Sequence, residues 1–148
     1  MNTLKLSEVT LEDCQILMPI ENACHSHPWT ENTLKSCIGG RYFGEKLSDN
    51  NRVLGFYIGE YIAGEATLMD ICVSPTHQGK GLGKKLLSAF LASCKQKSTE
   101  SIFLEVRASN TAAHLMYINS GFIEIARRTG YYPSEQGYED AIVMKLSL

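Results

Sequence analysis

The spacing of apolar residues in the first forty positions predicts a short strand followed by two helices. Leu4 to Val9 alternates as a strand does, and Thr10 to Asp13 has the pattern of a capping box that opens a helix. A second helix is predicted after Thr30, its N-cap, and ends at Gly39-Gly40. The inward faces are predicted to be Cys14, Leu17 and Met18 in the first helix, and Leu34, Cys37 and Ile38 in the second.

The pattern then changes to strand-like runs that predict an antiparallel meander. The runs are Tyr42 to Leu47, Arg52 to Tyr61 and Ala63 to Val73, separated by turn residues. The third run is long and carries Glu65 and Asp70 among apolar residues. These two acidic residues predict a bulge or an exposed face part-way along that strand.

The second half predicts alternating helices and strands. Apolar residues recur at helical spacing from Leu82 to Cys94, and Ser101 to Arg107 has the pattern of a buried strand. Asn110 is placed to cap a short helix that ends at Gly121. Strands at Phe122 to Arg128 and Tyr138 to Leu146, linked by a loop over 129–137, complete an α/β layout in a single domain spanning 1–148.

Composition and charge narrow the classes of protein. The chain has 44% hydrophobic and 20% charged residues, typical of a globular domain, and its net charge of −2 with scattered basic residues argues against a nucleic-acid partner. The first residues lack the apolar run of a signal peptide, and no apolar run has the length of a membrane span. We therefore expect a soluble, cytoplasmic protein with no membrane partner.

The five cysteines form an odd set without Cys-x-x-Cys spacing, so neither a disulfide framework nor a zinc ribbon is predicted. Cys24-His25-Ser26-His27 contains metal-ligand residue types, but the sequence nearby offers no third firm ligand, and the segment precedes Pro28 where a helix ends. A loop is the preferred interpretation, with no metal centre.

The segment from Val73 to Leu87 is the strongest chemical signal, because a strand-like run stops at a glycine-rich turn that opens a helix. Glycines at 79, 81 and 83 let backbone N–H groups close on an anion, and the helix N-terminus adds its positive dipole end. Neither the dinucleotide fingerprint nor the Walker spacing is matched. An ordinary glycine-rich helix start is the alternative.

Gln78-Gly79-Lys80-Gly81-Leu82-Gly83 does match Gln-x-x-Gly-x-Gly, and with the order of elements it resembles the GNAT superfamily of N-acetyltransferases. The resemblance implies a mixed, mostly antiparallel sheet with flanking helices and a splayed acetyl-CoA cleft, and no metal. Gly79 stands where relatives often carry a basic residue, which bears on pyrophosphate affinity. The residues implied to bind acetyl-CoA are Ile71, Cys72 and Val73 through their backbone, Gln78, Gly79, Lys80, Gly81, Leu82, Gly83, Lys84 and Asn110.

Acetyl transfer to an amine requires a base for the ammonium and an acid for the departing thiolate. Glu105, in Leu104-Glu105-Val106-Arg107, occupies the position of the family's general base, and Tyr117 is the candidate general acid. The structural alternatives are a Glu105 carboxylate that faces water or pairs with Arg107, and a Tyr117 ring that packs on Phe122. Direct attack within a ternary complex needs no acetyl-enzyme.

Four blocks in the second half are similar to members of this superfamily that acetylate the N-terminal alanine of protein eighteen of the small ribosomal subunit. They are 104–110, 117–122, Tyr131-Tyr132-Pro133 and Glu139-Asp140-Ala141. The resemblance implies that the N-terminal peptide of a ribosomal protein lies between the loop of Trp29 and the loop carrying Tyr131 and Tyr132, with Glu139 and Asp140 near a basic second residue. Two alternatives stay open: a GNAT enzyme acting on lysines or small amines, and a non-catalytic CoA-binding module.

Overall fold

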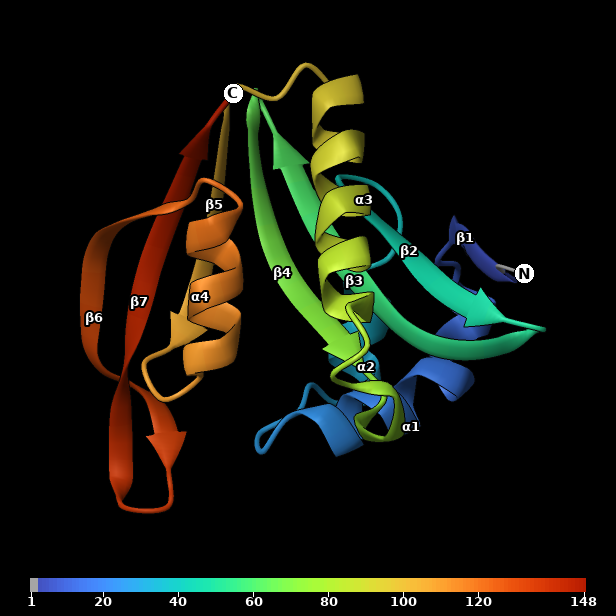
Figure 1. Ribbon diagram of the computed structural model, residues 1–148, viewed down its shortest axis with the longest axis horizontal. Helices are drawn as coiled ribbons and strands as arrows, with labels where there is room; N and C mark the ends of the chain where they lie inside the picture. Colours follow the sequence, from blue (N-terminus) through green and yellow to red (C-terminus); the bar gives the residue numbers. More distant parts are fainter. Residues whose placement is uncertain (1–2) are drawn as a thin grey trace.

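A computed structural model describes residues 3–148; Met1 and Asn2, which the predicted domain includes, lie outside this range. Seven strands of the described residues form one sheet in the order β1-β2-β3-β4-β5-β7-β6 (Figure 1). Adjacent strands are antiparallel except β4 and β5, which are parallel. The strands are β1 (Leu4–Glu8), β2 (Tyr42–Asp49), β3 (Arg52–Ile62), β4 (Glu65–Val73), β5 (Ser101–Arg107), β6 (Ile123–Ser134) and β7 (Gly137–Ser147). The predicted mixed, mostly antiparallel sheet is confirmed.

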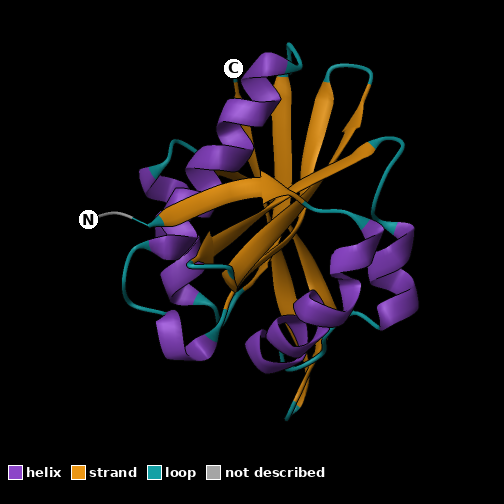
Figure 2. Ribbon diagram, turned by 90° about the vertical axis from the view of Figure 1, so that its right-hand side faces the viewer, coloured by secondary structure: helices purple, strands orange, loops and turns teal. Residues whose placement is uncertain are grey.

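Helices cover both faces of this sheet (Figure 2). The α-helices are α1 (Cys14–Cys24), α2 (Glu31–Ser36), α3 (Leu82–Gln96) and α4 (Thr111–Asn119), and short 3-10 turns occupy Leu11–Asp13 and Pro75–His77. No helix within residues 3–148 is long and apolar enough to cross a membrane.

The helix starts follow from the predicted caps. Thr10 N donates to Asp13 Oδ2 at 2.7 Å, Thr30 Oγ1 accepts from Thr33 N at 3.2 Å, and Asn110 Oδ1 accepts from Ala113 N at 3.2 Å. The inward face of α1 is corrected in part. Met18 is only partly buried, whereas Ile20 and Glu21 are buried, because helical spacing places these two on the same face as Cys14 and Leu17.

Alternation along β3 divides the interior into two cores, one on each face of the sheet. Phe56 and Ile58 pack with α1 and α2, while Tyr57 packs with α3 and with Phe90 at a ring-centroid distance of 5.5 Å. The two cores hold the helices in place on either side of the strands that carry the candidate site.

A β-bulge at Met69 reverses the alternation of β4. Gly59 pairs with Leu68 and Ile58 pairs with Asp70, so Met69 has no partner of its own. Ala66 and Leu68, before the bulge, therefore face the core under α3. Cys72, after the bulge, faces the core under α1, and Asp70, two residues before Cys72, lies on the same side of the strand. The bulge confirms the prediction for this run; the other option, an exposed face at Asp70, is wrong because Asp70 is buried.

Strands β4 and β5 pair only at their first three residues and then separate. Their parallel register joins Glu65 to Ser101, Ala66 to Ile102 and Thr67 to Phe103. Beyond these pairs the two strands diverge, as Figure 1 shows below the contact between them. The predicted splay is present, and it leaves the end of β4 without a strand partner on its β5 side, while its other side stays paired with β3.

The predicted loop over 129–137 is wrong, because β6 continues to Ser134 and β7 starts at Gly137. Tyr132 pairs with Glu139 and Pro133 with Tyr138, after an irregularity between Arg128 and Tyr132. That irregularity contains Gly130, with a φ of +61°, so the strand bends and then resumes. The result is a hairpin that extends beyond the body of the sheet (Figure 1).

Candidate active site

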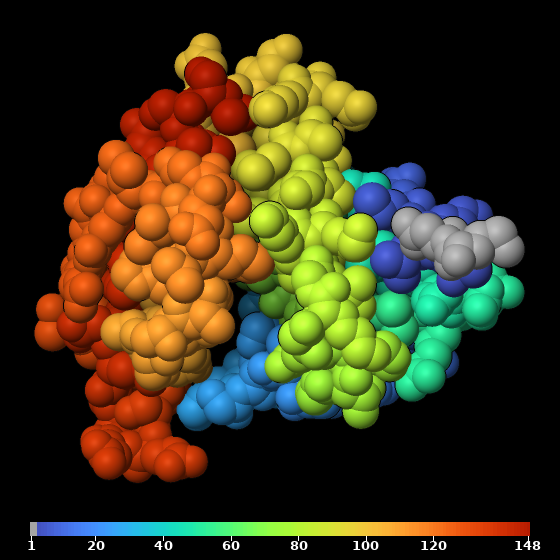
Figure 3. Space-filling model, in the orientation of Figure 1, coloured from blue at the N-terminus to red at the C-terminus, as the bar shows by residue number. Residues whose placement is uncertain are grey.

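A cavity of about 530 Å³ opens where β4 and β5 separate. It runs through the sheet, so its walls come from both faces: the end of β4, the glycine turn and α4 on one side, and β5 and the α1–α2 segment on the other. The space-filling view shows the hollow between α4 and the turn before α3, with the α1–α2 segment at its lower end (Figure 3).

The glycine turn presents open backbone to this cavity. Gly79 and Gly81 both have a φ of +77°, in the left-handed region, and a Cβ placed on either would meet no protein atom within 4 Å. The first backbone bond into α3 runs from Lys85 N to Gly81 O at 3.2 Å, so the N–H groups of residues 79–84 have no backbone partner among the described residues and can serve a ligand. This arrangement fits an anionic ligand such as a pyrophosphate.

Gln78 has a structural part in the same turn, because its Nε2 donates to Val73 O at 3.0 Å and ties the turn to the end of β4.

The predicted cofactor residues divide into two groups. Ile71, Cys72, Val73, Gln78, Gly79, Gly81, Leu82, Gly83 and Asn110 line the cavity, whereas the side chains of Lys80 and Lys84 are exposed outside it.

Glu105 lines the cavity from β5. Leu104 and Val106 are buried and Glu105, on the opposite face, keeps 27% of its side chain exposed. Glu105 Oε1 lies 3.0 Å from Nε of Arg128 on β6, not beside Arg107 as the alternative interpretation held. Arg107 instead donates to Pro133 O at 2.7 Å and stacks over the Tyr132 ring.

Tyr117 reaches the cavity from α4, on the other side of the splay. Burial, followed by the nearby charge of Asp70, raises the pKa of the Tyr117 hydroxyl well above its ordinary value. The hydroxyl therefore stays protonated at neutral pH and can donate a proton. The packing on Phe122, the structural alternative, is present with ring centroids 5.9 Å apart, and the role of Tyr117 as general acid stays a prediction that this packing does not exclude.

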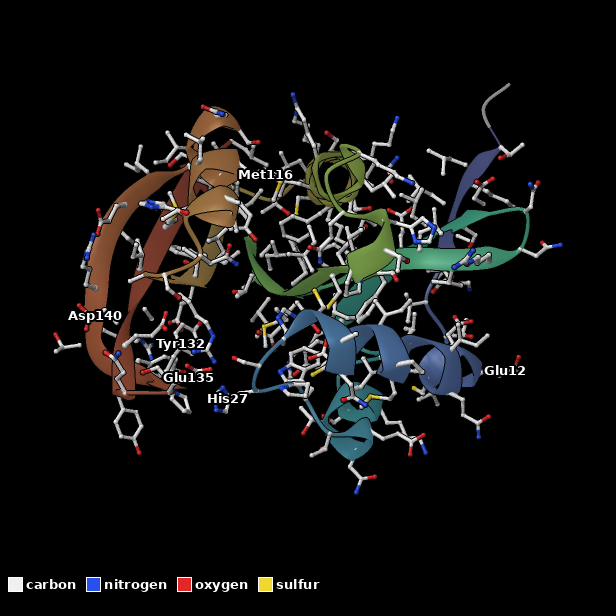
Figure 4. All side chains as sticks on the ribbon, turned by 60° about the horizontal axis from the view of Figure 1, so that its bottom comes forward. Glu12, His27, Met116, Tyr132, Glu135 and Asp140 are labelled. Carbon is white, nitrogen blue, oxygen red and sulfur yellow. The ribbon has the colours of Figure 1, made fainter. Side chains whose placement is uncertain are left out.

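Trp29 and Tyr132 line the other end of the cavity, as predicted for a peptide site. Figure 4 shows Tyr132 and His27 on facing sides of the gap between the β6–β7 hairpin and the α1–α2 segment. Arg107 Nη2 lies 3.5 Å from His27 Nδ1 and joins the two walls. Burial, and then the charge of Glu105, raises the pKa of Tyr132 to about 12.

Three residues predicted for the peptide lie elsewhere. Tyr131, Glu139 and Asp140 are outside the cavity lining, and Asp140 lies on the outer side of the hairpin (Figure 4). Glu139 accepts hydrogen bonds from Ser109 N and Oγ, and Asp140 accepts one from Gly130 N at 3.0 Å. Their carboxylates are thus used within the protein, and alternation along the extended hairpin explains why Tyr132 enters the cavity while Tyr131 does not.

Sequence reasoning missed a polar cluster on the cavity wall made of Glu21, His25, Asp70 and Cys72. His25 Nε2 lies 2.8 Å from Asp70 Oδ1 and 3.0 Å from Cys72 Sγ, and Cys72 Sγ lies 3.2 Å from Glu21 Oε1. Burial raises the pKa of the Glu21 carboxyl and of the Cys72 thiol. Burial lowers the pKa of His25, but the hydrogen bond with Asp70 and the charges of Asp70 and Glu21 together outweigh burial and raise the pKa overall.

Two spacings in the sequence carried a signal for this cluster. Glu21 and His25 are four apart on one helix face, and Asp70 and Cys72 are two apart on one strand face. The bulge at Met69, invisible in the pattern, decides that the second pair faces the first. The argument that His25 lacks ligand-type neighbours therefore fails, although the absence of a metal stays untested.

Residues 12–122 match the acetyltransferase (GNAT) family, and the chain belongs to that family. It is similar, with 39% identity over all 148 of its residues and 99% of the relative, to the ribosomal protein bS18-alanine N-acetyltransferase of Escherichia coli strain K12. The predicted superfamily and the predicted class of enzyme, an N-acetyltransferase, are confirmed.

Solved structures agree with this assignment. The crystal structure of the Escherichia coli ribosomal-protein-S18-alanine N-acetyltransferase superposes with a TM-score of 0.95 at 38% identity, covering 97% of this chain and 93% of that one. The fold is shared more widely. The yncA protein of Salmonella typhimurium, solved with its cofactor acetyl-CoA, has a TM-score of 0.84 at 19% identity, covering 99% of this chain and 95% of that one. Acetyltransferases of this family use acetyl-CoA.

Proposed function

We propose that this protein transfers the acetyl group of acetyl-CoA to the N-terminal alanine of ribosomal protein bS18. The observation that carries the proposal is the full-length identity of 39% to an enzyme named for that reaction. The free state of all five cysteines supports action in a reducing compartment such as the cytoplasm.

Acetyl-CoA would be held by the glycine turn and by the separated end of β4. Open backbone at Gly79 and Gly81 and the start of α3 suit its pyrophosphate, and the edge of Ile71 to Val73 that faces away from β3, where β5 no longer pairs, suits its pantetheine arm. Lys80 and Lys84 would act as exposed point charges near the phosphates. Acetyl-CoA supplies an activated thioester whose carbonyl carbon the amine attacks.

The proton transfers are assigned to Glu105 and Tyr117. The Glu105 carboxylate takes a proton from the substrate ammonium, the amine nitrogen forms a bond to the acetyl carbon, and the carbon–sulfur bond breaks. The nitrogen releases its second proton to water as the neutral amide forms. The Tyr117 hydroxyl gives its proton to the departing thiolate. Both groups line one cavity from opposite faces of the sheet, which supports direct transfer without an acetyl-enzyme.

The acceptor would enter between Trp29 and Tyr132. An N-terminal amine has a pKa of about 8, against about 10.4 for lysine, so deprotonating lysine near neutral pH costs roughly 3 kcal/mol more. A site that relies on one partly buried carboxylate as its base thus favours N-terminal amines. Tyrosine and tryptophan rings supply flat contact area for an extended peptide at low entropic cost.

Incubation with acetyl-CoA and peptides, followed by mass spectrometry, tests the proposal. We expect acetylation at the α-amine of a peptide that begins with the N-terminal sequence of bS18, and none on the same peptide with a blocked N-terminus and free lysines. Equal rates on the blocked peptide, with acetyl on lysine, would favour a lysine or small-amine acetyltransferase. Binding of acetyl-CoA without any transfer would favour a non-catalytic module.

A further inference from the structure

The cluster of Glu21, His25, Asp70 and Cys72 has no part in the proposed chemistry and brings metal-ligand atoms together. One ligand atom from each side chain lies within 4.8 Å of the others, and Cys24 forms a second such group with His25 and Cys72. His25 and Cys72 are thus common to both groups. Glu21 lies in the last turn of α1 and His25 is its C-cap, while Asp70 and Cys72 share one face of β4.

We propose that this cluster is a zinc site, with His25 Nε2, Cys72 Sγ and the Asp70 carboxylate as ligands and Glu21 as the fourth. Thiolate, imidazole and carboxylate together are the donor set that Zn²⁺ accepts in proteins, whereas Mg²⁺ and Ca²⁺ prefer oxygen alone. Cys24 Sγ lies within 4.8 Å of the ligand atoms of His25 and Cys72 but is not grouped with Asp70, so Glu21 is the preferred fourth ligand.

The distances are close to those that a zinc ion requires. His25 Nε2 lies 2.8 Å from Asp70 Oδ1, 3.0 Å from Cys72 Sγ and 3.7 Å from Glu21 Oε1. In a tetrahedral site the ligand atoms lie roughly 3.3–3.6 Å apart. The two shorter distances, to Asp70 and Cys72, therefore need to lengthen by about half an ångström, and the longer one to Glu21 needs to shorten slightly, changes within reach of side-chain torsions.

A second observation points to a ligand that is not part of the protein. Asp70 Oδ2 is buried and accepts no hydrogen bond from an N–H, hydroxyl or thiol group of the described residues, so only the neighbouring Glu21 carboxyl, when protonated, can donate to this oxygen of Asp70, whose side chain is only 5% exposed. A buried carboxylate oxygen without a partner is costly, and a cation would satisfy it.

The site has a way in for an ion. The His25 side chain is 37% exposed, and all four residues border the cavity between α1 and the end of β4. Zinc bound there would join α1 to β4 beside the Ile71–Val73 backbone. The inference does not depend on the proposed function, because it concerns binding of the metal alone.

Titration of untagged, chelator-stripped protein with Zn²⁺ in a calorimeter tests the proposal. We expect one equivalent to bind and the melting temperature to rise with zinc. His25→Gln, at the exposed edge of the site, and Cys72→Ala are each expected to weaken binding tenfold or more. His114→Gln and Cys37→Ala, which remove an imidazole from α4 and a buried thiol near α2, are expected to leave binding unchanged.

Cobalt gives a readout that identifies the ligands. We expect Co²⁺ to produce a thiolate charge-transfer band that disappears in Cys72→Ala and persists in Cys37→Ala. Absence of stoichiometric zinc binding would overturn the proposal and leave the cluster as a self-contained hydrogen-bond network. Binding that His25→Gln and Cys72→Ala weaken by less than tenfold would overturn it as well, since the ion would then sit elsewhere.

Discussion

Arg128 on β6 reaches across β7 to Glu105 on β5, where its Nε lies 3.0 Å from Glu105 Oε1. Arg128 keeps 54% of its side chain exposed, so this ion pair contributes about 0–1 kcal/mol to stability at most. Its larger effect is to orient the carboxylate proposed as the base. Arg128 is therefore a candidate positioning residue.

Arg128→Gln is expected to lower kcat roughly tenfold, because a base that is no longer held in place loses reactive geometry. The melting temperature and the KM for acetyl-CoA are expected to change little. Arg127→Gln is the matched control, since the neighbouring Arg127 pairs with Glu124 at 2.6 Å instead. Steady-state kinetics give kcat for both variants. An equal loss of kcat in the two would contradict a positioning role for Arg128.

Glu105→Gln is expected to lower turnover by roughly 10²-fold or more near neutral pH. Activity is expected to recover as pH rises, because an N-terminal amine with a pKa of about 8 then loses its proton unaided. Glu139→Gln, outside the cavity, is the control. A pH–rate profile identical to that of the unmodified protein would contradict the role of Glu105 as general base and leave it a structural role, the ion pair with Arg128.

Gly81→Ala is expected to weaken acetyl-CoA binding, because the new Cβ enters open cavity where the phosphates are proposed to lie. Its φ of +77° also adds backbone strain of about 1 kcal/mol or more. Gly39→Ala separates the two effects, since Gly39 has a φ of +86°, no atom within 4 Å of the added Cβ, and no place in the cavity. Calorimetry measures the affinity for acetyl-CoA. The same affinity in both variants would contradict the proposed binding of the phosphates by the glycine turn.

Tyr132→Ala is expected to raise the KM for peptide more than the KM for acetyl-CoA, because the Tyr132 ring lines the acceptor end of the cavity. Tyr131→Ala is a close control: its ring lies 5.0 Å from that of Tyr132 but outside the cavity lining. Two-substrate kinetics measure both constants. A similar rise in peptide KM for both variants would point to the hairpin as a whole instead of this side chain.

Asp13→Asn is expected to destabilise the protein at neutral pH by about 1 kcal/mol or more, through loss of its cap. Burial raises the pKa of Asp13, but hydrogen bonds from Thr10 N and Lys46 Nζ outweigh burial and lower the pKa below 3.8. A lowered pKa stabilises the fold above pH 3.8, and this contribution is lost as pH falls through the lowered value. Urea unfolding at several pH values should show the difference between the two proteins narrowing in acid, whereas the exposed control Glu12→Gln should show none.

Local patterns in the sequence were enough for most of the fold. Helix caps at Thr10, Thr30 and Asn110 depend on neighbours within one helical turn, and a half-buried strand shows apolar residues at every second position. Both features can therefore be predicted from short stretches of sequence, and so can the glycine turn. The boundary of the β6–β7 hairpin could not, because a bulge near Gly130 lets the strand continue through residues that look like a loop.

The sequence by itself determined the α/β layout, the anion-binding turn and the candidacy of Glu105 and Tyr117, because these rest on local spacing or on resemblance carried by short motifs. Only the tertiary structure decided which side chains meet across the sheet. The bulge at Met69 turns Asp70 and Cys72 toward Glu21 and His25, and the strand order places Arg128, not Arg107, against Glu105. Such contacts join residues far apart in the chain, and a shift of one residue in register reverses which face a side chain occupies.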